Sequence, residues 1–214
     1  MSTTKLGGYL VIVAAIGLLI SQLFDGIVSP EASGLIAIWS NTGFTFGVFA
    51  FCYYFIQDDK DNGLLYLIPI LALMGWTANS VGIGMRLPQE TTNIESVNAL
   101  TSMAGAVGFS AGGAGFLSNA LLGYYILGKP KFNSNIIYKI VTIIFIIGSI
   151  GFVALGILIP LVTEGREVAT IAGEAGKNML PFDGGFLAII WIPGIISTLV
   201  WTCLLYTSDA ADDT

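Results

Sequence analysis

Histidine is absent from the 214 residues of this chain, and cysteine occurs only twice. Without imidazole, the chain has no histidine for a zinc site, for ligation of haem iron, or for Ser/His and Cys/His catalysis. The two cysteines, Cys52 and Cys203, do not make a disulfide framework. Cys52 lies within an apolar stretch and is predicted to be a small packing residue. The residue inventory therefore excludes several classes of enzyme and metalloprotein.

Charged side chains are also scarce, at 10% of the residues, against about 25% in an ordinary soluble domain. Hydrophobic residues make up 55% of the chain, and the mean hydropathy is +0.83. The apolar residues are gathered into blocks separated by short polar segments, an arrangement that suits a lipid core about 30 Å thick. We expect an all-α, polytopic integral membrane helical bundle whose surroundings are the lipid bilayer, with no cofactor and no nucleic-acid partner.

Each apolar block is long enough to cross a bilayer. We predict about six transmembrane helices in one domain, 1–202, with spans at 6–24, 35–56, 64–85, 99–127, 136–162 and 185–202. Polar and turn-forming segments separate these blocks. They are residues 29–34, the link 57–63, Arg86-Leu87-Pro88 at the end of the third span, and Gly128-Lys129-Pro130-Lys131 at the end of the fourth.

Residues 203–214 do not continue the pattern. The run from Cys203 reads like the translation of a transposase sequencing adapter, so we interpret 203–214 as a sequencing artefact and exclude it from the fold. Its three aspartates supply half of the formal net charge of −6. The number of helices is accordingly a minimum, and a seventh helix beyond Thr202 stays open.

Lysine and arginine predict the orientation, because cytoplasmic loops carry an excess of both. With the spans above, five basic residues lie on the side of the N-terminus and three on the other. The five are Lys5, Lys60, Lys129, Lys131 and Lys139, and the three are Arg86, Arg166 and Lys177. We predict a cytoplasmic N-terminus in a bacterial-type inner membrane.

The fourth span carries small or polar residues at mostly four-residue intervals. These are Ala104, Gly108, Gly112, Gly115, Asn119 and Gly123. In lipid, such a face lets a neighbouring helix approach closely enough for dispersion contacts, and Asn119 offers a hydrogen bond across it. We interpret the stripe as a helix-packing face. A flexible or pore-lining helix is the alternative.

Two asparagines define a candidate polar pocket. Asn41 and Asn79 lie six or seven residues from corresponding ends of the second and third spans, so at 1.5 Å per residue both are roughly 10 Å deep. The full set of candidate pocket residues is Gln22, Asn41, Thr45, Asn79, Ser80 and Arg86. We favour the interpretation that the asparagines hydrogen-bond to each other or to backbone and fix helix pairing.

No ionisable side chain falls in the middle of any predicted span, which disfavours a proton relay, a voltage sensor or a retinal Schiff base. We therefore predict a non-enzymatic structural, sensory or assembly component, with a homo-oligomer or another membrane protein as its possible partner. The competing hypothesis is a facilitator of a small neutral solute that uses the polar pocket. A third hypothesis is an enzyme acting on lipid through Arg86, Glu90 and Glu95.

Overall fold

The computed structural model describes residues 3–23, 29–91, 107–130 and 136–162, and every element in these ranges is helical. In chain order they are α1 (Thr3–Leu23), α2 (Pro30–Asp58), α3 (Leu64–Thr91), the π-helical turn η1 (Val107–Ala111), α5 (Gly113–Leu127) and α7 (Ile136–Val162). The all-helical class predicted from composition is confirmed for this part of the chain. The predicted sixth span, 185–202, and the segment 203–214 lie outside the described residues.

The start of α2 corrects one prediction. Residues 29–34 do not form a turn, because α2 begins at Pro30. Ser29 is the N-cap, and its Oγ accepts a hydrogen bond from the backbone N–H of Ala32. Proline is suited to the first turn, where its missing N–H has no intrahelical partner to lose. The same residue types that signal a turn therefore open a helix here.

Two further segments differ from the prediction. The apolar stretch of α3 has the predicted bounds, Leu64–Met85. The helix itself continues through Arg86-Leu87-Pro88 to Thr91, so this proline does not end it. The predicted fourth span is not one continuous α-helix, because η1 precedes Gly112 and α5 follows it. A π-helical turn places one more residue between hydrogen-bonded groups than an α-helix does, and such turns are frequently found at functional sites.

Other helix ends agree with the predictions. α3 begins at Leu64, where the Asn62 side-chain oxygen accepts from the backbone N–H of Leu64. α5 ends at Leu127 with Gly128 as its C-cap, and α7 has the predicted bounds. These ends depend on local turn chemistry, which can be read from sequence.

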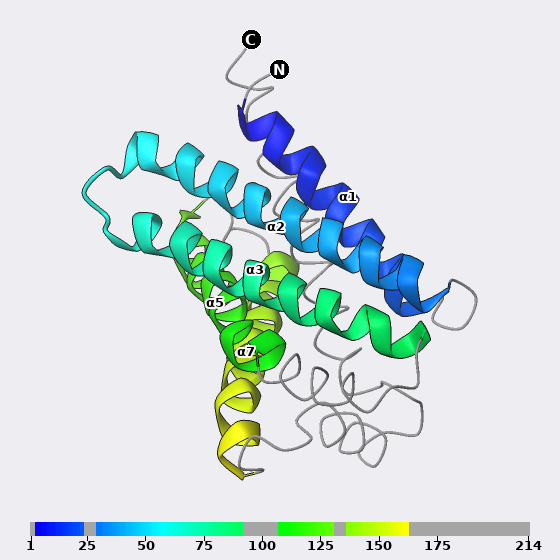
Figure 1. Ribbon diagram of the computed structural model, residues 1–214. Helices are drawn as coiled ribbons and strands as arrows, with labels where there is room; N and C mark the ends of the chain where they lie inside the picture. Colours follow the sequence, from blue (N-terminus) through cyan, green and yellow to red (C-terminus); the bar gives the residue numbers. More distant parts are fainter. Residues whose placement is uncertain (1–2, 24–28, 92–106, 131–135, 163–214) are drawn as a thin grey trace.

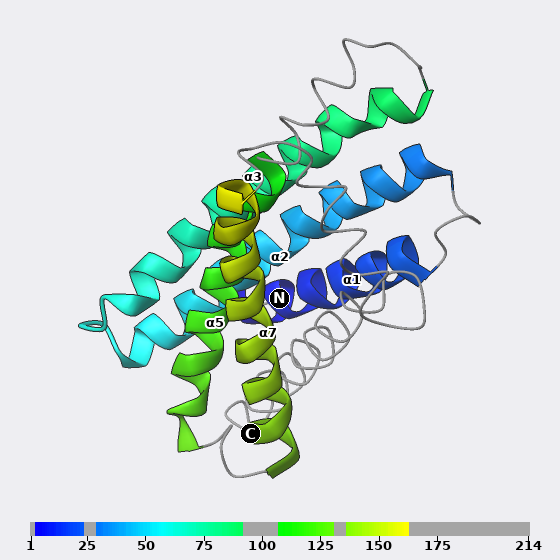
Figure 2. The same cartoon turned by 90° about the horizontal axis from the view of Figure 1, so that it is seen from below.

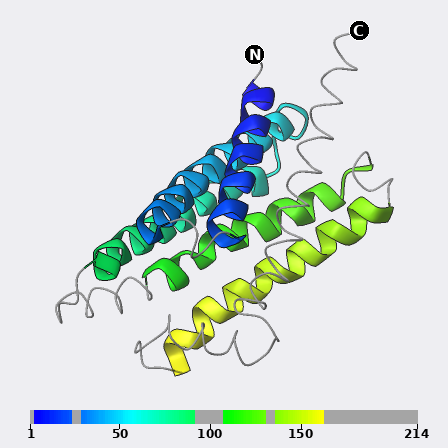
Figure 3. The same cartoon turned by 90° about the vertical axis from the view of Figure 1, so that its right-hand side faces the viewer.

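The helices form two groups. α1, α2 and α3 lie side by side with alternating direction, and α5 and α7 run together across them obliquely (Figures 1 and 2). Figure 3 shows the same order from the side, with α7 farthest from α1. Contacts follow the order α1 to α2, α2 to α3, α3 to η1 and α5, and α5 to α7. α3 is therefore the helix that joins the two groups.

A chain of aromatic rings crosses this arrangement from α2 to α7. Phe44 stacks on Trp76 with centroids 6.0 Å apart, and Trp76 meets Phe116 edge to face at 5.1 Å. Phe116 then stacks on Phe152 at 4.3 Å. Such pairs contribute about 0.5–1.5 kcal/mol each beyond the area they bury. The four rings link α2, α3, α5 and α7.

Many large apolar side chains face outward. On α7 the exposed residues include Ile136, Ile140, Ile143, Ile147 and Ile150. Exposed apolar surface on this scale is expected where the solvent is lipid. Among the described residues, three helical stretches are long and apolar enough to cross a membrane: Ala32–Asp58, Leu64–Met85 and Ile136–Ala154. Within the described ranges, Leu6–Gly17 and Gly113–Leu127 are shorter apolar stretches.

A candidate cavity between α2 and α3

Glycine contacts set the distances between the helices that form the site. A Cβ atom on Gly75 of α3 would overlap the backbone of Gly115 on α5, and one on Gly115 would lie 3.0 Å from the Trp76 ring. On the other side, a Cβ on Gly47 of α2 would overlap the Val11 side chain of α1. The absence of side chains at these positions allows α3 to approach α5, and α2 to approach α1, closely.

The two predicted asparagines lie in contact. Asn41 Nδ2 donates to Asn79 Oδ1 at 2.8 Å and to Ser80 Oγ at 3.2 Å. Asn79 Nδ2 in turn donates to the backbone oxygen of Gly108 in η1 at 3.3 Å. Thr45 Oγ1 donates to the backbone oxygen of Asn41 at 2.9 Å. These bonds connect α2, α3 and η1 through side chains that lie within an apolar bundle.

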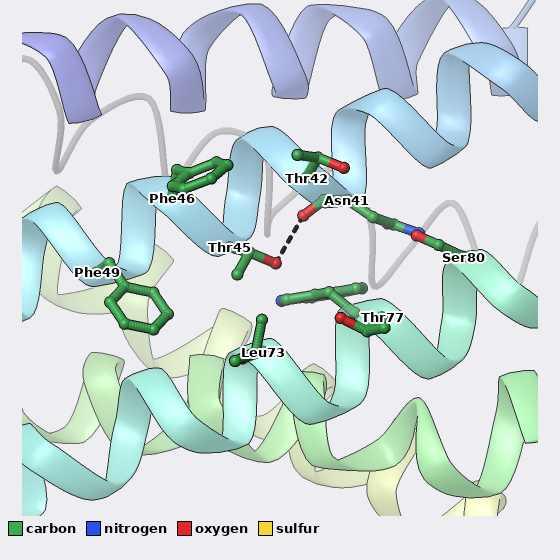
Figure 4. Close-up of a pocket in the computed structure, with 9 residues that line it drawn as sticks. Asn41, Thr42, Thr45, Phe46, Phe49, Leu73, Thr77 and Ser80 are labelled. Carbon is green, nitrogen blue, oxygen red and sulfur yellow. Dashed lines mark hydrogen bonds between the residues drawn. The ribbon is translucent and has the colours of Figure 1, made fainter.

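An open cavity of about 400 Å³ lies beside this hydrogen-bond network. The residues that line it come from α2 and α3: Asn41, Thr42, Thr45, Phe46, Phe49, Leu73, Trp76, Thr77 and Ser80. Figure 4 shows Asn41 and Thr45 pointing from α2 toward α3, with Thr77 and Ser80 on the facing helix. The volume of the cavity is in the range of small-molecule sites, which combine apolar walls with a few polar groups.

Trp76 is the most deeply buried large residue of the cavity wall. Its side chain is 2% exposed, and in the described part of the chain its indole Nε1 has no hydrogen-bond partner. A buried donor left unpaired costs about 1–3 kcal/mol. Thr45, which lines the same cavity, uses its hydroxyl hydrogen toward Asn41, so its oxygen keeps the capacity to accept a bond.

No ionisable side chain belongs to the cavity lining. In the described ranges, no group of three or more Cys, Asp and Glu residues is arranged to hold a metal ion. The cavity therefore offers hydrogen bonds and apolar surface to a ligand but no charge. That combination suits a neutral molecule, because a charged group placed there would lose its hydration without gaining a partner.

A second polar cluster lies at one end of the bundle, outside the apolar stretches of α2 and α3. Asp59 Oδ2 accepts hydrogen bonds from Asn62 at 3.2 Å and Tyr125 at 3.0 Å, and Lys129 Nζ lies 3.3 Å away. Lys129 also lies over the Tyr125 ring. The bonds from Asn62 and Tyr125 hold the pKa of Asp59 below its ordinary value. The hydrogen bond with Tyr125, and to a smaller extent the hydrogen bond with Asp59, raises the pKa of Lys129 above its ordinary value.

Only some of the predicted pocket residues line the cavity. Of the predicted pocket, Asn41, Thr45 and Ser80 line the cavity. Asn79 is not among the lining residues but accepts a hydrogen bond from Asn41. Gln22 lies in α1 and Arg86 in α3, but their side chains lie outside the described part of the structure.

The residues of the predicted packing face do not all lie on one helix, because Gly108 belongs to η1 while Gly115, Asn119 and Gly123 belong to α5. A Cβ on Gly108 would meet Gly82 of α3 at 3.5 Å, and Gly115 lies against Trp76. Gly123 is buried and Asn119 is half-buried. A Cβ on Gly112 would overlap the carbonyl oxygen of Gly108, which lies in η1 just before it. Ala104 lies outside the described residues.

Sequence reasoning missed the apolar wall of the cavity. The predicted pocket does not include Phe46, Phe49, Leu73 or Trp76. A single apolar residue on an apolar helix has no sequence feature that marks it as part of a site. The spacing of Trp76 before Asn79 places both on one side of α3, since residues three apart are neighbours on a helix. That signal was present in the sequence.

Comparisons with protein-family models, with curated proteins and with solved structures give no match. The cavity and the hydrogen bonds beside it are the features of this chain that bear on function.

Proposed function

We propose that this chain is a multi-pass membrane protein with a non-enzymatic structural, sensory or assembly role. The observation that carries the proposal is the hydrogen-bond network from Asn41 through Asn79 to Gly108. The donors of both amides are directed to other helices rather than to an open path. Polar side chains used in this way hold helices together, with measured contributions of about 0.6 kcal/mol each on average.

The location of the charges supports the same role. The Asp59 and Lys129 pair lies outside the apolar stretches, where it connects the α2–α3 turn to the end of α5. A nucleophile paired with a base is not found among the residues that line the cavity. The chemistry present there is suited to association and recognition.

A facilitator of a small neutral solute is the second candidate, favoured by the cavity of about 400 Å³ that opens beside the network. The two functions are separated by flux measurements on the purified chain in proteoliposomes, with glycerol and urea as solutes. Under the structural role, flux equals that of empty liposomes. Flux above that level which the double variant Asn41→Leu, Asn79→Leu abolishes would establish the facilitator instead.

The assembly role is tested by the oligomeric state in mild detergent and by crosslinking in native membranes. We expect a defined homo-oligomer or a stable complex with another membrane protein. A chain that stays monomeric and uncrosslinked in the membrane would count against assembly. Turnover of labelled phospholipid by the purified chain, lost in Arg86→Gln, would replace the non-enzymatic role with lipid chemistry.

A further inference from the structure

The cavity between α2 and α3 contains polar groups that the helix-pairing role leaves unused. Trp76 Nε1 is a buried donor without a partner in the described residues, and the Thr45 hydroxyl oxygen retains acceptor capacity. Both residues line the same space. A buried N–H in an apolar bundle has little water to pair with, so a ligand oxygen at this position recovers a lost hydrogen bond.

The remainder of the cavity wall is apolar and reaches the outer surface of the helices. Phe46 is 58% exposed, Phe49 41% and Leu73 51%. All lining residues fall inside Ala32–Asp58 or Leu64–Met85, the apolar stretches of α2 and α3. A cavity at this level opens toward lipid chains if the helices cross the membrane, so its ligand enters from the bilayer.

We propose that this cavity binds a neutral amphiphile from the bilayer, a molecule with an apolar body and a single hydroxyl group. The hydroxyl oxygen accepts from Trp76 Nε1, and its hydrogen is available to the Thr45 oxygen. The apolar body lies along Phe46, Phe49 and Leu73. The absence of an ionisable lining residue excludes a carboxylate or phosphate head group from a favourable position there.

This inference goes beyond the structural role and does not depend on it, because the asparagine network is complete without a ligand. Trp76 joins the two features, since its ring takes part in the aromatic chain and the same residue lines the cavity. A ligand at this position contacts a residue whose neighbours lie on α2 and α5.

The test is photolabelling of the full chain in phosphatidylcholine nanodiscs with a diazirine-bearing dodecanol. A diazirine-bearing dodecane of equal length, which lacks the hydroxyl, is the matched probe. We expect the alcohol to label the cavity segments of α2 and α3, and excess unlabelled dodecanol to suppress that labelling. The hydrocarbon is expected to spread over lipid-facing surfaces, including α7.

Trp76→Phe removes the donor and keeps an aromatic ring, so we expect dodecanol to compete at least about tenfold less well, the equivalent of 1.4 kcal/mol. Trp39→Phe is the matched control, because Trp39 is 73% exposed and does not line this cavity. Equal, unsaturable labelling by both probes would overturn the proposal. If Trp76→Phe fails to fold, the comparison of the two probes on the unaltered chain decides the question.

Discussion

At the scale of single residues, the asparagines illustrate how a polar group is accommodated in an apolar bundle. Asn79 uses its oxygen toward Asn41 and its nitrogen toward Gly108. Without Asn79, the Asn41 amide loses the acceptor of its shortest hydrogen bond, and the Gly108 backbone oxygen loses the hydrogen bond that the Asn79 side chain donates to it. Because both groups are in low-dielectric surroundings, the loss is larger than that of an exposed hydrogen bond.

Asn79→Leu is therefore expected to lower the free energy of unfolding by about 1–2 kcal/mol. The measurement is reversible unfolding in mixed detergent micelles followed by circular dichroism. Thr42→Val is the control, because Thr42 donates only to the Ile38 backbone oxygen of its own helix. An equal effect of the two substitutions would show that the network between helices adds nothing.

The Asp59 cluster predicts a pH dependence of stability. The pKa of Asp59 is lowered in the folded chain, chiefly by the hydrogen bond from Asn62. Its contribution is therefore present above the pKa of the unfolded chain and is lost as the pH falls through the folded value. The pKa of Lys129 is raised, chiefly by Tyr125, so its contribution is complete below the unfolded value and lost as the pH rises through the folded one.

Asp59→Asn is expected to flatten the loss of thermal stability on the acid side, while Lys129→Met flattens it on the alkaline side. Melting temperatures across the pH range provide the measurement. The neighbouring exposed residues supply controls, Asp58→Asn and Lys60→Met. Unchanged acid and alkaline limbs in both cluster variants would contradict the linkage.

At the scale of elements, the contact between α3 and α5 depends on two glycines. A Cβ on Gly75 would overlap the backbone of Gly115, and a backbone cannot move aside as a flexible side chain can. Another glycine of the same helix, Gly84, has open space where its Cβ would be. The two positions have the same residue type in the same helix but different surroundings.

Gly75→Ala is expected to destabilise the chain by about 3 kcal/mol, the upper end of usual overpacking costs. Gly84→Ala should be neutral or stabilising by up to about 1 kcal/mol, since alanine is the better helix former. Both values come from the same unfolding measurement. Similar stabilities for the two variants would mean that α3 and α5 are not held at this distance.

At the scale of the whole molecule, the contact between Asp59 and Lys129 has a topological consequence. It brings the α2–α3 turn and the segment after α5 to one end of the bundle. The lysine count predicts that this end is cytoplasmic, and that the link before α2 lies on the opposite side.

We expect Lys60→Cys to react with a membrane-impermeant maleimide only after permeabilisation of the cells, and Ser29→Cys to react in intact cells. The background replaces Cys52 and Cys203 by alanine, although Cys52 is buried at 1% exposure. The reverse pattern of labelling would invert the orientation. Labelling of both positions in intact cells would place the link and the turn on the same side.

Much of the helical organisation follows from the sequence. The all-helical class, the start of α3, the end of α5 and the bounds of α7 depend on apolar composition and on short-range capping chemistry. The errors at Ser29 and Pro88 arose where one residue type has two local uses. The interruption by η1 was not predicted, because a π-helical turn has no composition that sets it apart from a glycine-rich α-helix.

The sequence by itself determined that Asn41 and Asn79 lie at one level, because depth along a helix follows from the rise per residue. Only the tertiary structure decided that they face each other, that Gly108 completes the network and that Trp76 forms the wall of a cavity. The direction of a side chain depends on how each helix is rotated about its axis. That rotation is set by contacts such as Gly75 against Gly115, which join residues far apart in the sequence.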